Sequence, residues 1–131
     1  MQMAEIVNNP VSEVFDAWKD AVTVLVGNNY SMDSSSQIAK APYARILLMG
    51  NPGRRWDLEG NETATTPSFQ CESFASGHNP LKQVYQIDEA SHQAMTNLGF
   101  RRTWGPELIE NQESSIRRVV SRYSRIYTGF F

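Results

Sequence analysis

The stretch GFRRTWGPELIENQESSIRRVVSRYSRIYTGFF, residues 99–131, decides the fold of this chain. Gly99-Phe100 predicts the end of a helix, and two arginine-rich extended runs follow it, Arg101–Glu110 and Ile116–Tyr127. The polar residues Asn111–Ser115 suit a hairpin loop between the two runs. The stretch therefore predicts a helix end, a strand, a turn and a second strand.

The second predicted strand has two faces of mixed character. Successive side chains of a strand point to opposite sides. One side carries Val119, Ser121, Tyr123, Arg125 and Tyr127, and the other carries Arg118, Val120, Arg122, Ser124 and Ile126. A half-buried strand of an isolated monomer normally keeps one dry and one wet face. The mixture therefore indicates that both sides contact something, either another subunit or a polyanion.

Charge is distributed unevenly along the chain. The formal net charge is -2, but residues 101–131 carry +3 and residues 1–100 carry -5. This polarity suits head-to-tail association of identical copies as well as binding of a polyanion. A third interpretation is a solvated strand edge that its charges protect from further pairing.

Two amphipathic helices are predicted, each starting at an Asn-Pro pair whose asparagine caps free backbone donors. The first begins at Asn9-Pro10 and ends at Gly27. Its positions at helical spacing are Val11, Val14, Phe15, Trp18, Val22 and Leu25. The second begins at Asn79-Pro80 and ends at Gly99, which suits a left-handed cap. Its positions at helical spacing are Leu81, Val84, Tyr85, Ile87, Ser91, Met95 and Leu98.

Further strands are predicted between the two helices. Tyr43–Met49 is too short for a convincing helix and predicts a strand. Gly50–Arg55 predicts a turn, and Trp56–Glu62 has weak strand character. Thr63–Ala75 favours a pleated surface, but Pro67 interrupts it. This run is therefore either an edge strand or two pieces joined by a kink.

The length of 131 residues predicts one domain, spanning 1–131. The serine-rich segment 28–42 is expected to be a long, exposed and flexible connection, and residues 128–131 a short tail. Because the strands come in hairpin groups, the fold class expected is α+β. Its architecture is a mainly antiparallel sheet of about four to five strands with two main helices packed on it.

Combinations of residues that could carry chemistry are weak. Cys71, His78 and His92 lie seven and fourteen residues apart, which matches no zinc-ligand spacing. Cys71 also lacks an obvious orienting partner for nucleophilic catalysis, and it is expected to be a small buried apolar residue. His92 is expected on the wet side of its helix. The acidic pairs Asp57/Glu59 and Asp88/Glu89 look like ordinary surface carboxylates.

Phosphate binding and targeting signals are equally weak. Gly50–Arg55 follows a predicted strand, but no Lys-Ser or Lys-Thr pair follows it. A single cysteine allows no internal disulfide, and residues 1–6 lack the pattern of a signal peptide. The sequence therefore predicts no catalytic, cofactor-binding or metal-binding residues, no membrane association, and synthesis in a cytoplasm.

Tryptophans beside arginines are the remaining candidates. Such groups could stack on bases, anchor a protein interface, or be core tryptophans whose arginine neighbours reach solvent. An interface is favoured, since the acidic first hundred residues would repel a phosphate backbone. The expected contact residues are Arg54, Arg55, Trp56, Arg102, Trp104, Arg118, Arg122, Arg125, Tyr127 and Phe130.

Over roughly residues 11–128, the chain resembles the tail terminator, or tail completion, proteins of long-tailed bacteriophages. That family shares a first helix, a strand opening with tyrosine, a hairpin region, a helix ending in Gly-Phe, and a final antiparallel pair. The matching pieces are Pro42-Tyr43-Ala44-Arg45-Ile46, Thr65-Thr66-Pro67-Ser68-Phe69-Gln70, Val84–Gly99-Phe100-Arg101, and Arg117–Tyr127 with its Val119-Val120-Ser121-Arg122-Tyr123 centre. The segment 28–40 is longer than the family's role requires.

The resemblance implies a structural virion protein without enzymatic activity or a cofactor. It implies a ring of copies, usually a hexamer, at the head-proximal end of the tail in the neck of the virion. The ring would end tail-tube polymerisation and join the tail to the head connector. Implied partners are the chain itself, the tail-tube protein and a head-connector or stopper protein, with DNA only passing through the lumen. Assembly would take place in the host cytoplasm.

Two other functions stay open. One is a small nucleic-acid-binding module that uses the arginine-rich C-terminal hairpin. Its candidate residues are Arg101, Arg102, Arg117, Arg118, Arg122 and Arg125. The other is a small hydrolase or metal enzyme, which would reveal itself by bound zinc or an unusually reactive thiol.

Overall fold

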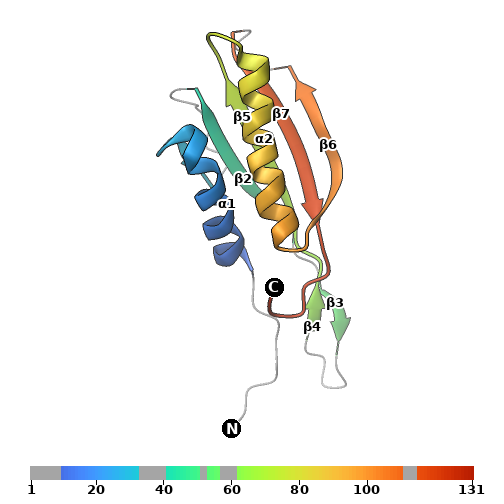
Figure 1. Cartoon of the computed structure of the whole chain (residues 1–131). Coiled ribbons are helices and arrows are strands. Elements are labelled where there is room, and N and C mark those ends of the chain that lie inside the picture. Colours follow the sequence, from blue (N-terminus) through green and yellow to red (C-terminus); the bar gives the residue numbers. More distant parts are fainter. Residues whose placement is uncertain (1–9, 33–40, 51–52, 57–61, 111–114) are drawn as a thin grey trace.

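The computed structural model describes residues 10–32, 41–50, 53–56, 62–110 and 115–131 (Figure 1). In chain order its elements are α1 (Val11–Val26), β1 (Tyr30–Ser31), β2 (Tyr43–Gly50), β3 (Gly53–Trp56), β4 (Glu62–Thr65), β5 (Ser68–Ala75), α2 (Pro80–Asn97), β6 (Arg101–Ile109) and β7 (Arg117–Ser124). Two helices and a mainly antiparallel five-stranded sheet make this an α+β fold, which confirms the predicted class.

The large sheet has the strand order β1-β2-β5-β7-β6. β1 runs parallel to β2, and the other neighbouring strands are antiparallel. α1 packs against β1 and β2, and α2 packs against β5, β7 and β6, so both helices cover one face of the sheet, here called the helix face (Figure 1). The other side is called the opposite face. β3 and β4 form a separate two-stranded sheet, the arm, beyond one end of the large sheet.

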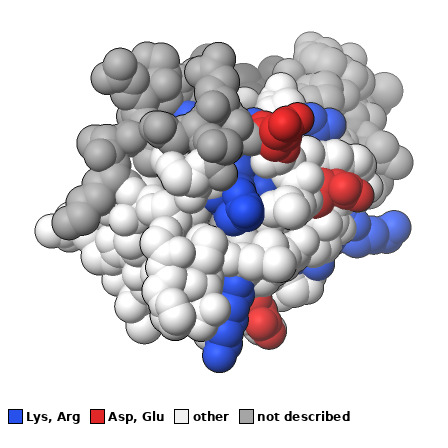
Figure 2. Space-filling view, turned by 90° about the horizontal axis from the view of Figure 1, so that it is seen from above, with Lys and Arg blue, Asp and Glu red and all other residues white. Residues whose placement is uncertain are grey.

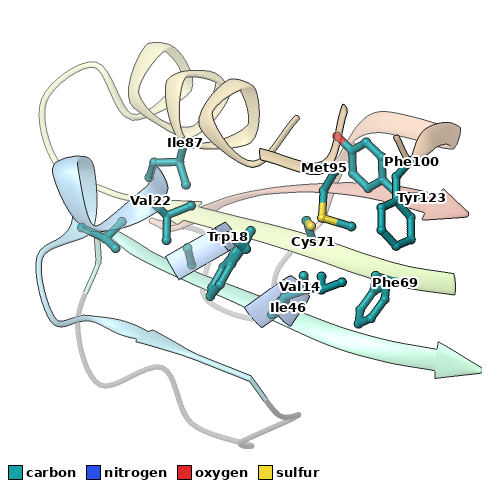
Figure 3. Close-up of a cluster of buried hydrophobic side chains, with 12 residues drawn as sticks. Val14, Trp18, Val22, Ile46, Phe69, Cys71, Ile87, Met95, Phe100 and Tyr123 are labelled. Carbon is teal, nitrogen blue, oxygen red and sulfur yellow. The ribbon is translucent and has the colours of Figure 1, made fainter. Parts of the chain in front are cut away.

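The main core lies between the helices and the helix face (Figure 3). α1 contributes Val14, Trp18 and Val22, which recur every fourth residue and are fully buried. β5 contributes Phe69 and Cys71 from alternate positions of the same strand. Full burial of each large apolar side chain contributes roughly 1.5–3 kcal/mol, so this cluster is the main source of stability for the fold.

The ends of the helices differ from the sequence prediction in detail. Asn79 precedes α2 with φ 50°, in the left-handed region, and its side chain makes no capping hydrogen bond. Asn9 lies outside the described residues, and Pro10 occupies the capping position of α1. Gly99 has φ +83°, as a left-handed helix end requires, and the N–H of Phe100 donates to the Met95 carbonyl at 3.0 Å. The predicted stop at Gly99 is therefore confirmed.

Some positions that helical spacing assigns to the core are at the surface. Leu25 is 38% exposed, because the buried stripe of α1 continues to Val26 instead. Leu81 and Tyr85 of α2 are also exposed. The stripe that α2 buries is shifted around the helix, and it includes Asp88.

Two strand predictions need correction, and a third is decided between its alternatives. Tyr30–Ser31, within the predicted connection 28–42, forms β1, because Tyr30 packs its ring against Phe15 and Trp18. Residues 33–40 of that connection lie outside the described residues. Gly53–Trp56 is a strand rather than a turn, and it pairs with β4. Pro67, which has no N–H to donate, separates β4 from β5, so the predicted alternative of two pieces is right. β5 lies between β2 and β7 and is not an edge strand.

The last strand, β7, has a buried helix face from Val119 to Tyr123. Val119, Ser121 and Tyr123 of β7 are all fully buried beneath α2. The prediction of two mixed faces is wrong for this side, because Arg125 and Tyr127 follow the end of the strand. The opposite face is mixed, as expected.

Candidate functional site

A buried carboxylate on α2 organises the helix face near β6 and β7. Asp88 is 3% exposed, and Ser121 of β7 donates to its Oδ1 at 2.7 Å. Arg102 of β6 donates from Nη2 to Asp88 Oδ2 at 3.1 Å and to the Tyr123 hydroxyl at 3.1 Å. This network connects α2, β6 and β7, and it neutralises Arg102 within its own chain.

Burial sets the protonation behaviour of the helix-face network. Burial raises the pKa of Asp88, although Ser121 and Arg102 act in the other direction. Burial also raises the pKa of Tyr123 to about 12. The His92 ring contacts the Tyr123 hydroxyl through Nδ1 at 3.2 Å, and burial followed by the charge of Arg102 lowers the pKa of His92. His92 is half-buried and lines a groove, so it lies only partly on the wet side of α2 that was predicted for it.

A groove of about 290 Å³ lies beside the helix-face network. Its walls come from α2 and β6, and they are Tyr85, Asp88, Glu89, His92 and Arg102. The polar groups at its floor hydrogen-bond to one another. Arg102 Nε is buried and has no hydrogen-bond partner among the described residues, so one donor beside the groove is left unsatisfied.

A second buried carboxylate organises the opposite face. Glu72 of β5 is 1% exposed, and its Oε1 accepts hydrogen bonds from Arg45 of β2 and Arg118 of β7. The closest N–O distance is 2.9 Å for each arginine. Both guanidinium groups also lie over the Phe74 ring, at 5.3 and 5.9 Å from its centroid. The three central strands are therefore joined by one charge cluster.

The opposite-face cluster extends to the edge of the sheet. Gln70 donates to Glu72 Oε2 at 2.7 Å, and Arg122 donates from Nε to Gln70 Oε1 at 2.8 Å. The Arg122 guanidinium lies over the Trp104 ring of β6 at 4.9 Å. Burial opposes ionisation of Glu72, but the hydrogen bonds from Gln70 and Arg45 and the nearby positive charges hold its pKa below the usual value.

A third site, the terminal pocket, lies where α2 ends, β6 begins and β7 ends. Its volume is about 400 Å³, and its walls include the hydroxyl side chains Thr66, Thr103 and Ser124. Arg101 and Arg125 also line it. Arg101 is exposed, and Arg125 is half-buried. Among the described residues, its lining includes two arginines and no acidic residue.

The arm carries three of the expected contact residues. Arg54, Arg55 and Trp56 belong to β3, and their side chains lie outside the described residues. The base of the arm is joined to the C-terminal segment by paired backbone hydrogen bonds of 2.9 Å between Thr65 and Tyr127. Among the described elements, β4 alone makes extensive contact with β3.

The other expected contact residues divide into exposed and buried groups. Trp104 is 38% exposed and Phe130 is 74% exposed, and Arg122 is also at the surface. Tyr127 is fully buried beside the arm, so its place among surface contacts is a correction. Arg102 and Arg118 are each mostly covered and pair with a buried carboxylate of their own chain, and their place in an interface stays a prediction.

The sequence interpretation missed both organising carboxylates. Asp88 was assigned to the surface, yet it lies four residues after Val84 and three before Ser91, on the buried stripe of α2. Glu72 stands between Cys71 and Ser73 in β5, a strand that is buried on both faces. Helical spacing was the signal for Asp88. For Glu72, the signal was its place in an otherwise uncharged central strand.

The remaining chemical candidates can be placed as well. Cys71 is fully buried in the core, as predicted, and burial raises the pKa of its thiol well above the usual value. Within the described residues, no three His, Cys, Asp or Glu side chains are grouped as metal ligands. No helix among the described residues is long and apolar enough to cross a membrane. The chain matches no family model and no curated protein.

Proposed function

We propose that this chain is a structural protein of a bacteriophage neck. Identical copies form a ring at the head-proximal end of the tail, where the ring ends tail-tube polymerisation and contacts the head connector. The order of elements supports this proposal: a helix, a strand opening with Tyr43, a hairpin region, a helix ending at Gly99-Phe100, and an antiparallel pair. The same order underlies the resemblance to tail terminator proteins.

The arm is the observation that carries the proposal. A two-stranded hairpin is marginally stable by itself in water. Here β3 and β4 extend beyond the end of the large sheet, and among the described elements they contact mainly each other (Figure 1). Ala64 and Thr65 of β4 are buried, and Thr65 pairs with Tyr127, so the base of the arm is held within the subunit. A neighbouring subunit that covers the rest of the arm would add packing to it. An extension of one subunit onto the next is typical of a heterologous contact, which closes into a ring when the rotation allows it.

Internal pairing of arginines weighs against the nucleic-acid alternative. Arg102 and Arg118 of the hairpin are held by Asp88 and Glu72, and Arg122 is held by Gln70 and Trp104. Figure 2, which looks onto one end of the molecule, shows basic and acidic groups interspersed, with uncharged surface between them. A phosphate backbone binds most strongly to a continuous cationic stripe.

Mass measurement and electron microscopy test the proposal together. Light scattering over a range of concentrations is expected to show assemblies several times heavier than one chain of 14.8 kDa. Added to preformed tail tubes, the protein is expected to appear as a ring at one tube end and to stop further growth. A matched control is a variant in which a Gly-Ser linker replaces residues 53–65. Monomers at every concentration, combined with tubes that grow normally, would contradict the proposal.

A further inference from the structure

The terminal pocket holds one arginine in a fixed position. Arg125 donates from Nε to the Ile126 carbonyl at 2.9 Å and from Nη1 to the Leu98 carbonyl. Its guanidinium also lies 5.1 Å from the Phe131 ring centroid. A guanidinium has five N–H donors, so these two bonds leave three for other acceptors.

Arg125 approaches the end of α2 closely at a glycine. A Cβ at residue 99 would lie 2.7 Å from Arg125 Nη1, and φ at Gly99 is +83°. Gly99 therefore both ends the helix and makes room for the guanidinium. Arg101 supplies a second positive charge to the same pocket, with Thr103 beside it. A held guanidinium beside a second, exposed one suits a carboxylate, which accepts bidentate hydrogen bonds.

The first helix presents carboxylates at regular spacing. Glu13, Asp16 and Asp20 lie at helical spacing on α1, and all three are exposed. In the described part of the chain, none of them forms an ion pair. α1 packs on the β1–β2 side of the sheet, whereas the terminal pocket lies at the β6–β7 side (Figure 1).

We propose that the terminal pocket binds the acidic stripe of α1 from a second copy of this chain. The inference rests on the proposed ring, and it identifies one contact between its subunits. Asp16 or Asp20 of one copy pairs with Arg101 and Arg125 of the next. Because stripe and pocket lie on different sides of each subunit, the contact is heterologous and can repeat around a ring.

A second copy fits this pocket better than a nucleic acid does. Glu107 and Glu110 are exposed at the other end of the β6 region, so a phosphate backbone following that edge would meet negative charge. A helix that places its carboxylates only at the pocket avoids them. The contact is between charges near the surface, so it should weaken as salt concentration rises.

A charge-swap experiment tests the proposed contact. Arg101→Glu places a negative charge in the pocket, where it meets the carboxylates of α1. The double variant Asp16→Arg with Asp20→Arg places positive charges on α1, where they meet the arginines of the pocket. Each is expected to weaken self-association by about 100-fold, since like-charge contacts cost several kcal/mol. Mixed in equal amounts, the two proteins again have complementary charges at every contact. Light scattering is expected to show an alternating assembly of wild-type mass.

Controls separate this contact from the proposed function and from DNA binding. Lys82→Glu changes an equal charge at an exposed site on α2 and should leave assembly unchanged. Normal assembly of Arg101→Glu, or failure of the mixture to assemble, would overturn the α1 contact while leaving a ring possible. Wild-type protein that stays monomeric would overturn both proposals. Loss of DNA-duplex affinity in Arg101→Glu without a change of mass would assign the pocket to a polyanion and overturn the contact.

Discussion

Two pairs of arginines near the C-terminus have the same sequence context and different surroundings. Arg102 and Arg118 reach buried carboxylates, Asp88 and Glu72, from strands β6 and β7. Arg101 and Arg125 instead line a pocket at the end of the same hairpin. The first pair is neutralised inside the subunit, and the second keeps donors for an external acceptor. A count of arginines cannot separate these roles, because burial and partner decide them.

The two carboxylates that hold Arg118 and Arg102 differ in how well their charge is compensated. Glu72 accepts from two arginines and a glutamine, and its pKa is held below the usual value despite burial. Asp88 pairs with one arginine, and burial raises its pKa. Glu72 is therefore well compensated and Asp88 less so. Substitutions at the two positions should therefore change the unfolding free energy by different amounts and with different pH dependence.

The largest effect is expected for Glu72→Gln. The change removes the negative charge that Arg45 and Arg118 share, and both guanidinium groups are mostly covered. A broken buried pair costs 3–5 kcal/mol, and partial exposure of the arginines reduces this to about 2–3 kcal/mol of unfolding free energy. Chemical denaturation at pH 7 measures it.

Acid titration gives a second test of Glu72. Its folded-state pKa is lowered, so its contribution is present above the ordinary value of 4.5 and is lost as pH falls through the folded value. The stability difference between wild type and Glu72→Gln should therefore shrink below about pH 4.5. Glu107→Gln, at an exposed site on β6, is the control for removal of a carboxylate. A constant difference down to pH 2 would remove Glu72 as the organising charge.

A smaller loss is expected for Gly99→Ala, which tests the support of the outer pair. The new methyl group contacts Arg125 Nη1, and the alanine must adopt φ +83°. A residue with Cβ pays roughly 1–2 kcal/mol in the left-handed region. Thermal unfolding measures the loss, and Gly77→Ala, with φ +84° and nothing within 4 Å of the added Cβ, is the control for conformational strain alone. Equal losses in both variants would show that the contact with Arg125 costs nothing.

Asp88→Asn should cost at most about 1 kcal/mol, because asparagine keeps an acceptor for Ser121 while no longer paying for a buried charge. The raised pKa of Asp88 means that its ionisation weakens the folded state. Its stabilising contribution is complete below the ordinary value of 3.8 and is lost as pH rises through the folded value. Wild type should therefore lose stability relative to Asp88→Asn as pH rises from about 4. The opposite slope in paired denaturation curves would contradict this.

Arg101→Ala is the smallest change to the isolated subunit. Arg101 is exposed, so its removal should alter unfolding free energy by less than about 0.5 kcal/mol. Urea denaturation at high salt, where surface contacts between copies are screened, is the suitable measurement. A loss as large as that of Glu72→Gln would mean that Arg101 has an internal role, and the contrast between the two pairs would fail.

Much of the fold could be predicted from the sequence because periodicity reports local burial. The helices, the final hairpin and the break at Pro67 follow from spacing and backbone chemistry. The arm was only partly predicted, since Gly53–Trp56 looks like a turn until β4 pairs with it. Tyr30 of β1 was missed because its strand depends on contacts with Phe15 and Trp18 rather than on a local pattern.

The candidate sites were harder to predict because they depend on pairs that are distant in sequence. Arg118 and Glu72 come from neighbouring strands, and nothing local to either residue announces the other. The sequence showed the excess of positive charge at the C-terminus and proposed acidic partners on another copy. Arg102 and Arg118 have acidic partners in the same chain, and the expectation of a partner on another copy stays a prediction for the residues at the terminal pocket.

The central claim is that subunits join through two different surfaces of the same chain. Native mass spectrometry of the wild-type protein at low salt, over a range of concentrations, tests this most directly. The account predicts a closed assembly of one defined copy number, with six as the expected value, that weakens as salt rises. A monomer at every concentration would contradict it, and so would a dimer that does not grow, because two-fold pairing would use one surface of each chain.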